Sequence, residues 1–152
     1  MSRSMSRIPV DLNTLTRDVV CDVLETMFFS TAVISGPCAC PHQLARGASL
    51  EFHGAFAGTF FAMLTPGVAR ALAGACLGLS DEEITSETES QLACELANVL
   101  CGGVLSRLDP EASVYLSAPQ PINGCPRHIG WCEWLETPEG PLCVGLSLLG
   151  EH

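Results

Sequence analysis

The sequence predicts an α+β fold in which a largely antiparallel sheet is covered by helices. Three observations lead to this class. Segments with helical periodicity and short β-prone runs follow one another as one helix, a pair of strands, two helices and then three strands. The length of 152 residues is that of one domain with a substantial core. Hydrophobic residues make up 47% and charged residues only 16%, so much of the chain must be buried in the fold or in a subunit contact.

The domain is expected to span residues 11–150 and to follow a flexible N-terminus, residues 1–10. It begins with an amphipathic helix from Asp11 to about Phe29, for which Asp11 or Asn13 is a candidate cap. The apolar stripe of this helix is formed by Leu12, Leu15, Val19, Val23 and Met27.

The next region is predicted to be rich in strands. A β-prone run over residues 30–35 ends at the breakers Gly36-Pro37, and a loop follows over residues 38–47. Two further strands are predicted at about residues 49–53 and 59–64. Glycines at both sides of their junction permit a tight reversal.

Two helices come next. The first begins at Pro66, which suits a first helical turn, and stops at Gly78. The second begins in an acidic stretch with two patterns of capping-box spacing, Ser80-x-x-Glu83 and Ser86-x-x-Glu89. It continues to about Leu108 and stops before Asp109-Pro110.

The C-terminal part is strand-like. One strand is predicted at residues 114–118, after which Pro119, Pro121 and Asn123-Gly124 break the chain. Strands at about residues 128–136 and 142–149 form a hairpin through residues 137–141. On the last strand, Val144, Leu146 and Leu148 alternate with Cys143, Ser147 and Leu149, so both faces need cover. With the low charged fraction, this surface predicts a homodimer to which the C-terminal hairpin contributes.

The second of the two central helices carries an unusual polar face. At about 100° per residue, its polar and small residues form one stripe of Gln91, Glu95, Asn98, Gly102 and Ser106. This face is short and flat, so another protein can approach it closely, and Glu95 and Asn98 would project side by side into the contact. Gly102-Gly103 costs roughly 1 kcal/mol per glycine within a helix. We therefore expect close backbone packing, of a partner at Gly102 or of the sheet at Gly103.

The order of these features resembles a known family. Glu95-x-x-Asn98, followed by Gly102 and by Pro121, is similar to the motif of the CheC/CheX/FliY family of chemotaxis phosphatases. The glycine-punctuated hairpin at residues 50–61, the helix at residues 66–79 and the acidic approach at residues 80–85 also look like those of the family. With one intact motif and a single-domain length, the chain resembles the CheX branch most, which implies a CheC/CheX-like fold and a dimer.

The resemblance also implies an activity, the hydrolysis of the aspartyl phosphate of a phosphorylated CheY-type response regulator. It makes Glu95 and Asn98 the catalytic pair and places Gln91 and Gly102 in the partner contact. Asn98 would orient a water, since an amide accepts and donates hydrogen bonds but is not a useful base. Glu95 would pair with a lysine of the partner. The chain itself is expected to bind no cofactor, because Mg²⁺ is supplied by the regulator.

Two features depart from the family pattern. Gln91 stands where the family often has Asp or Ser, which favours an alternative function, a catalytically silent dimeric interaction module of the same fold. In the first helix, Asp18-x-x-x-Asp22-x-x-Glu25 repeats the spacing of the motif with other side chains. We interpret it as a structural counterpart without the chemistry.

Charge and hydropathy argue against several classes of partner. The formal net charge of -10 disfavours nucleic acid and anionic membrane surfaces, which bind clustered Lys and Arg. No stretch approaches the roughly 20 apolar residues that span a bilayer. The N-terminus lacks the apolar region of a signal peptide, so we expect a cytoplasmic protein.

The nine cysteines raise a metal or redox alternative. An odd count without a secretion signal argues against a disulfide framework. Most of the cysteines lie in apolar runs, where a free cysteine behaves as a small hydrophobe; these are Cys21, Cys76, Cys94, Cys101, Cys132 and Cys143. Only Cys38-x-Cys40-x-His42 offers clustered ligands, and without paired C-x-x-C knuckles we predict no metal site.

Overall fold

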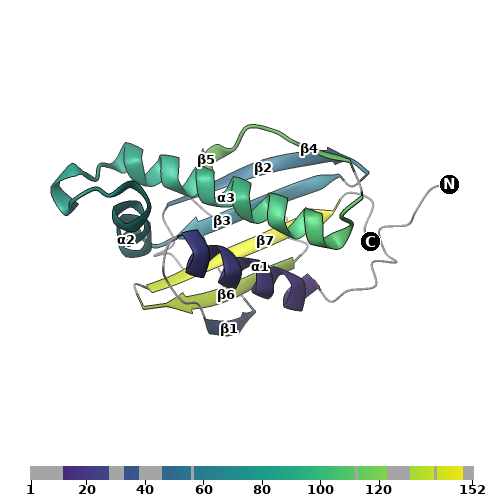
Figure 1. The fold of residues 1–152 in the computed structure, drawn as a ribbon, viewed down its shortest axis with the longest axis horizontal. Coiled ribbons are helices and arrows are strands. Elements are labelled where there is room, and N and C mark those ends of the chain that lie inside the picture. The colour runs from purple at the N-terminus through teal and green to yellow at the C-terminus, as the bar shows by residue number, and fades with distance from the viewer. Residues whose placement is uncertain are drawn as a thin grey trace.

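The computed structural model confirms the predicted fold class, because helices cover one face of an antiparallel sheet (Figure 1). It describes residues 12–27, 33–37, 46–55, 57–111, 113–122, 131–138 and 140–148. The predicted flexible N-terminus, residues 1–10, lies outside these ranges. Among the described helices, none is long and apolar enough to cross a membrane.

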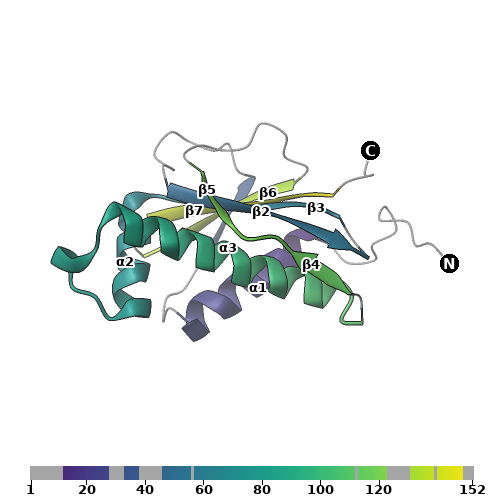
Figure 2. The same ribbon diagram turned by 90° about the horizontal axis from the view of Figure 1, so that it is seen from above.

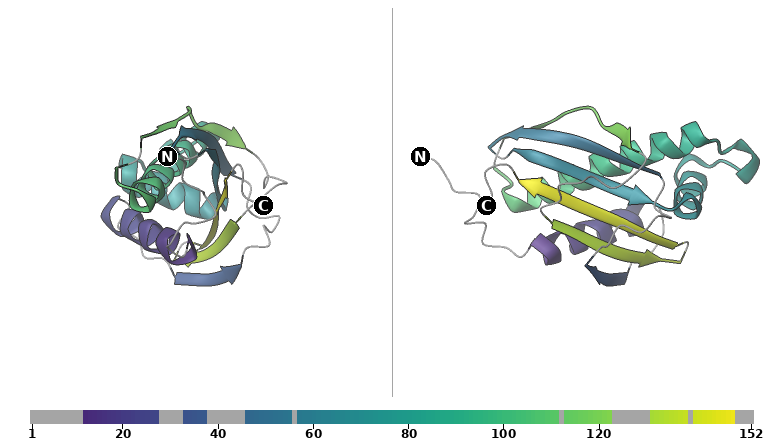
Figure 3. Two further views of the ribbon diagram at one scale, coloured as in Figure 1. Left: turned by 90° about the vertical axis from the view of Figure 1, so that its right-hand side faces the viewer. Right: turned by 180° about the vertical axis from the view of Figure 1, so that it is seen from behind.

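The described part of the chain forms a seven-stranded sheet in which every ladder is antiparallel. The strands are β1 (Val33–Pro37), β2 (Arg46–Gly54), β3 (Gly58–Leu64), β4 (Val114–Leu116), β5 (Gln120–Ile122), β6 (Trp131–Thr137) and β7 (Gly140–Leu148). Their order is β1-β6-β7-β3-β2-β4, and β5 pairs with β2 as well. Views from above and from the side show that the helices share one face of this sheet (Figures 2 and 3).

Three α-helices form the second layer. They are α1 (Leu12–Met27), α2 (Pro66–Leu77) and α3 (Ser86–Leu108), and the short 3₁₀ helix η2 (Asp81–Glu83) connects α2 to α3. The ends of α2 are those predicted. Thr65 caps its start by accepting a hydrogen bond from the Val68 N–H, and Gly78 ends it with φ of 70°, a conformation that suits glycine.

The core lies between the helices and the central strands. On β3, Phe60, Ala62 and Leu64 face the helices, and each stands opposite an apolar residue of β7. From α3, a row of buried leucines four residues apart packs onto this face: Leu92, Leu96 and Leu100. Burying one such side chain contributes roughly 2 kcal/mol. The row therefore fixes the rotation of α3 and directs the opposite side of the helix to solvent.

The C-terminal hairpin lies inside the sheet. β7 pairs with β6 on one side and with β3 on the other, and Leu142, Cys143, Val144 and Leu146 are all buried within the single chain. Most of the apolar residues that motivated a subunit contact are thus buried within the single chain, whereas Leu148 is half-buried and Leu149 lies outside the described residues. The homodimer stays a prediction.

Two of the predicted chain breaks are wrong. Gly36 and Pro37 lie within β1, where the register shifts between Ile34 and Gly36. Pro121 lies within β5 and pairs with Ala48 of β2. Proline lacks the N–H that a central strand uses in its hydrogen-bond ladder, but an edge strand tolerates it. Within the described part of the chain, β1 and β5 each pair with a single strand.

Other element ends differ by a few residues. β2 begins at Arg46, within the predicted loop 38–47, of which residues 38–45 lie outside the described part. The C-terminal hairpin is tighter than predicted, since Thr137 already pairs with Gly140. The first helix begins and ends within the predicted range.

The start of α3 also differs from the prediction. Thr85, rather than Ser86, caps the helix, because its Oγ1 accepts a hydrogen bond from the Thr88 N–H at 3.2 Å. The Ser80-x-x-Glu83 pattern caps the start of η2 instead, and the Ser80 N–H donates a hydrogen bond to Glu83 Oε1 at 2.8 Å.

Glu89 does not cap the helix but joins it to two other elements. Its carboxylate accepts from Arg46 Nε of β2 at 2.9 Å and lies 3.4 Å from Arg70 Nη1 of α2. The Glu89 side chain is only 7% exposed, whereas the arginines are 29% and 37% exposed. Arg70 also donates to the carbonyls of Asp81 and Ile84 in the connection before α3. These contacts fix the first turns of α3.

Replacing Glu89 with alanine should lower the free energy of unfolding by about 2–3 kcal/mol, because Arg46 and Arg70 then lose the buried carboxylate that lies between them. Urea denaturation measures the loss. Glu82→Ala removes an exposed carboxylate of η2 and should change stability by no more than about 0.5 kcal/mol. Equal effects of the two substitutions would contradict the role of Glu89.

The two adjacent glycines of α3 have different surroundings. A Cβ at Gly103 would lie 2.8 Å from Val19 Cγ1, so the close contact is with α1 and not with the sheet as expected. A Cβ at Gly102 would meet only Leu116 Cδ1, at 3.9 Å. Gly103 is therefore required by packing, whereas the fold leaves room at Gly102.

Alanine at these two positions should change stability in opposite directions. Gly102→Ala should raise the free energy of unfolding by up to about 1 kcal/mol through helix propensity. Gly103→Ala should lower it by about 1 kcal/mol or more, because the buried and rotationally stiff Val19 must move. Thermal unfolding of both variants measures the two changes in stability. A Gly103→Ala variant that is more stable than the wild type would show that Val19 of α1 moves aside at little cost.

Candidate functional site

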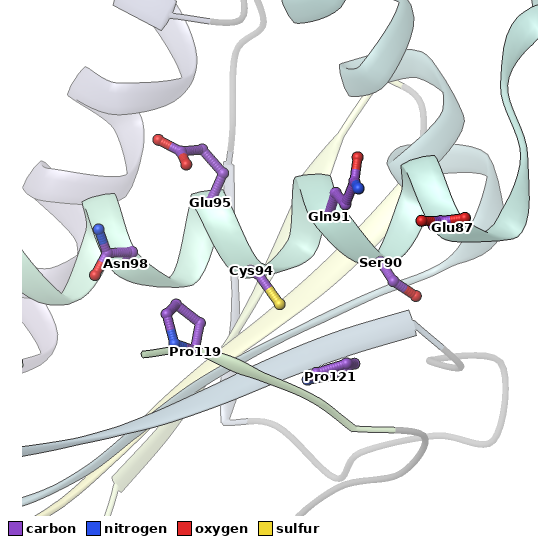
Figure 4. A pocket seen from close by; sticks show the side chains of 8 residues that line it. All are labelled: Glu87, Ser90, Gln91, Cys94, Glu95, Asn98, Pro119 and Pro121. Carbon is purple, nitrogen blue, oxygen red and sulfur yellow. The ribbon is translucent and has the colours of Figure 1, made fainter. Parts of the chain in front are cut away.

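The predicted polar stripe runs along the solvent side of α3. Gln91, Glu95 and Ser106 are exposed, and Asn98 and Gly102 are half-buried. The side chains of Gln91 and Glu95 point away from the strands below the helix, and Asn98 stands one turn further on (Figure 4). The structure thus places all the predicted site residues on one face of a helix whose other side is fixed in the core.

A cavity of about 390 Å³ adjoins this stripe. It lies between α3 and the chain segment that contains β5 (Figure 4). The cavity is lined by Glu87, Ser90, Gln91, Cys94, Glu95, Asn98, Pro119 and Pro121. Cys94 and Ser90 point across it toward the prolines (Figure 4), so a protein that docks on the stripe also covers the cavity.

A smaller cavity of about 120 Å³ lies next to the C-terminal half of α3. It is lined by Gly102, Leu105, Ser106, Asp109, Pro110, Val114 and Leu116. Gly102 and Ser106 belong to the stripe, and Val114 and Leu116 belong to β4. Both cavities therefore follow the side of α3 that faces residues 114–121.

Several residues at this face were not predicted as site residues. Glu87, Ser90 and Cys94 form a second helical row beside the stripe, with spacings of three and four residues. This spacing was readable from the sequence. The position of Pro119 was not, because it depends on the non-local pairing of β5 with β2.

The thiols near this face are not charged at neutral pH. Burial raises the pKa of the Cys94 thiol and raises that of Cys101 to about 12. A neutral thiol is a poor nucleophile. The polar groups of the stripe are therefore the Glu95 carboxylate, the amides of Gln91 and Asn98 and the Ser106 hydroxyl. The Glu87 carboxylate and the Ser90 hydroxyl lie beside them.

Within the residues that the structure describes, no group of three or more His, Cys, Asp and Glu is placed to hold a metal ion. The candidate ligands Cys38, Cys40 and His42 lie outside that part of the chain. The interpretation of the cysteines in apolar runs as free thiols that behave as small hydrophobes is wrong at two positions: Cys76 is exposed, and Cys143 is disulfide-bonded.

The acidic pattern of α1 lies on exposed positions. Asp18, Asp22 and Glu25 are all exposed, and Asp22 forms an ion pair with Arg107 near the end of α3. This contact gives Asp22 a role in joining the two helices. The reading of the pattern as a structural counterpart of Glu95-x-x-Asn98 stays a prediction.

Comparison with known proteins identifies the same family through a family model. The family model described as chemotaxis phosphatase CheX matches residues 46–133, which include α3 and the residues of both cavities. The CheX structure from Desulfovibrio desulfuricans is 16% identical, with a TM-score of 0.70 over 91% of this chain and 99% of that one. The CheX structure from Vibrio vulnificus is 15% identical, with a TM-score of 0.72 over 91% and 97%.

A third similar structure is a CheX-CheY-BeF3-Mg+2 complex from Borrelia burgdorferi, which is 12% identical with a TM-score of 0.67 over 91% of this chain and 98% of that one. At such identities these structures show a shared fold. The comparison with curated proteins gave no match. Since the family model covers more than half of the chain, including the helix that carries Glu95 and Asn98, the chain belongs to the CheX family of chemotaxis phosphatases.

Proposed function

We propose that this protein dephosphorylates the aspartyl phosphate of a CheY-type response regulator and that the stripe of α3 docks at the regulator's phosphorylation site. The family is that of a chemotaxis phosphatase, and a structure of the same fold was determined in complex with CheY. The observation that carries the proposal is the adjacent placement of the exposed Glu95 and the half-buried Asn98 on the solvent side of a helix whose other side packs in the core.

The reaction needs a positioned water more than it needs a strong base. Water attacks phosphorus, the bond between phosphorus and the aspartate oxygen breaks, and inorganic phosphate leaves with the regulator's carboxylate restored. Such transfers are accelerated mainly by alignment and charge stabilisation. The Asn98 amide suits this task, since its carbonyl oxygen accepts a hydrogen bond from the water while its NH₂ donates to a neighbouring oxygen.

Glu95 contributes to the binding of the regulator. Its exposed carboxylate stands one helical turn from Asn98 and would pair with a lysine of the regulator, which sets the register of the complex. Gln91 and Gly102 flank this pair on the same stripe. Gln91 adds a polar contact, and Gly102 leaves the backbone open to close approach. Mg²⁺ belongs to the regulator in this scheme and there neutralises charge on the phosphoryl group.

A second candidate function is a catalytically silent interaction module. Gln91, in place of the Asp or Ser that the family often carries, favours it. The decay of a phosphorylated CheY-type protein with and without this chain separates the two functions. An unchanged rate of phosphate release together with tight binding would leave only the interaction module.

Asn98→Ala should reduce phosphate release by about 100-fold, the typical cost of removing one hydrogen-bonding group that acts in the transition state, while binding of the regulator persists. The half-life of the phosphorylated regulator measures the effect. Thr26→Ala, at an exposed position of α1 outside the stripe, is the control and should retain activity. Near-normal activity of Asn98→Ala would contradict the assigned role.

Glu95→Ala should mainly raise the KM for the phosphorylated regulator, and Glu95→Lys should abolish binding, because like charges then face each other across the contact. Glu111→Lys changes the net charge equally at an exposed position outside the stripe and should bind almost normally. If Glu95→Lys bound as well as Glu111→Lys, the docking face would lie elsewhere.

A further inference from the structure

The cavity beside the stripe offers two kinds of surface to a docked partner. Its apolar wall consists of Pro119, Pro121 and the thiol of Cys94, which is neutral. The charged residues among its lining are Glu87 and Glu95, both exposed carboxylates. An occupant therefore meets apolar contact along its length and negative charge at the rim.

The cavity is held open by the fold. Pro121 is fixed by the pairing of β5 with β2, where it stands opposite Ala48, and proline rings keep the backbone of this wall stiff. On the other side, α3 is held by its buried leucines and by Glu89. A site that is already open when a partner arrives loses little free energy in reorganisation.

The residues that line the cavity are complementary to a long basic side chain. Lysine and arginine carry an aliphatic stem that packs on apolar surface and a terminal cation that stays near solvent or a counter-charge. This arrangement matches the prolines and Cys94 along the wall and Glu87 at the rim. The whole chain also carries a formal charge of -10, which attracts a basic partner surface.

We propose that this cavity receives a lysine or arginine side chain of the response regulator, as a second basic anchor in addition to the lysine that pairs with Glu95. The proposal rests on the proposed function, since Gln91, Glu95 and Asn98 line the cavity and also form the docking stripe. The second anchor contacts a side chain that takes no part in the reaction. It therefore affects which regulator binds and not the chemical step. Arginine is enriched among the residues that contribute most to binding at protein interfaces.

The charge of the anchor is tested with Glu87→Gln and the matched variant Glu82→Gln, which removes an exposed carboxylate of η2 away from the cavity. The substrate is the CheY-type regulator of the same genome, phosphorylated with acetyl phosphate. Glu87→Gln should raise KM about threefold to tenfold with little change in kcat, and the difference should vanish in about 1 M salt. Glu82→Gln should leave KM unchanged.

Whether the docked regulator covers the cavity is tested by alkylating the wild-type protein with N-ethylmaleimide and mapping the modified cysteines by mass spectrometry. Bound regulator, activated with beryllofluoride and Mg²⁺, should slow the alkylation of Cys94 at least fivefold. The exposed Cys76 is the internal control and should react at the same rate with and without the regulator.

The outcomes separate the anchor from the proposed function. Equal KM values for Glu87→Gln and Glu82→Gln would overturn the anchor while wild-type activity still supports the phosphatase. Protection of Cys94 without any dependence of KM on Glu87 would show that the regulator covers the cavity without a basic anchor, and would also overturn the proposal. If the wild type binds the activated regulator but releases no phosphate, the proposed phosphatase function is wrong. The Kd values of Glu87→Gln and Glu82→Gln for the regulator then test the basic anchor by themselves.

Discussion

The packing of α3 determines where the rest of this domain can lie. The helix contacts α1, α2 and the strands β2, β3, β4 and β5, and its buried leucines face the central strands. A rotation of about 100° would exchange this apolar row for the polar stripe. It would bury the Asn98 amide without a partner and expose leucine, and both changes cost free energy. The same contact that stabilises the domain therefore presents the site.

An ion-pair cluster and a close helix–helix contact fix the position of α3 in addition to its buried leucines. The carboxylate of Glu89, held between Arg46 and Arg70, ties α3 to β2 and α2. A partly buried ion pair of this kind adds little net stability, but it disfavours any arrangement that separates the partners. At the other end of α3, Gly103 lets Val19 of α1 approach the helix backbone. The helix is thus fixed at both ends by different forces.

A rigid helix suits a protein that supplies position rather than a reactive group. Near the stripe the thiols stay neutral, because burial raises the pKa of Cys94 and of Cys101. The carboxylate of Glu95 and the amides of Gln91 and Asn98 act only when they are held in register with a partner's own site. The family model spans this helix and the strands beneath it, so the scaffold and the candidate site are parts of one unit.

The sequence by itself determined the helices, most strands and the stripe of Glu95 and Asn98, because these depend on periodicity within one element. Pro66 and Gly78 mark the ends of α2 through local backbone preference alone. Only the tertiary structure decided what depends on contacts between distant segments. It showed that Glu89 binds arginines instead of capping α3, that Gly103 faces α1, that Pro121 joins an edge strand, and that β7 lies inside the sheet. The cavity beside Asn98 belongs to this second group, since its walls come from two segments that meet only when β5 pairs with β2.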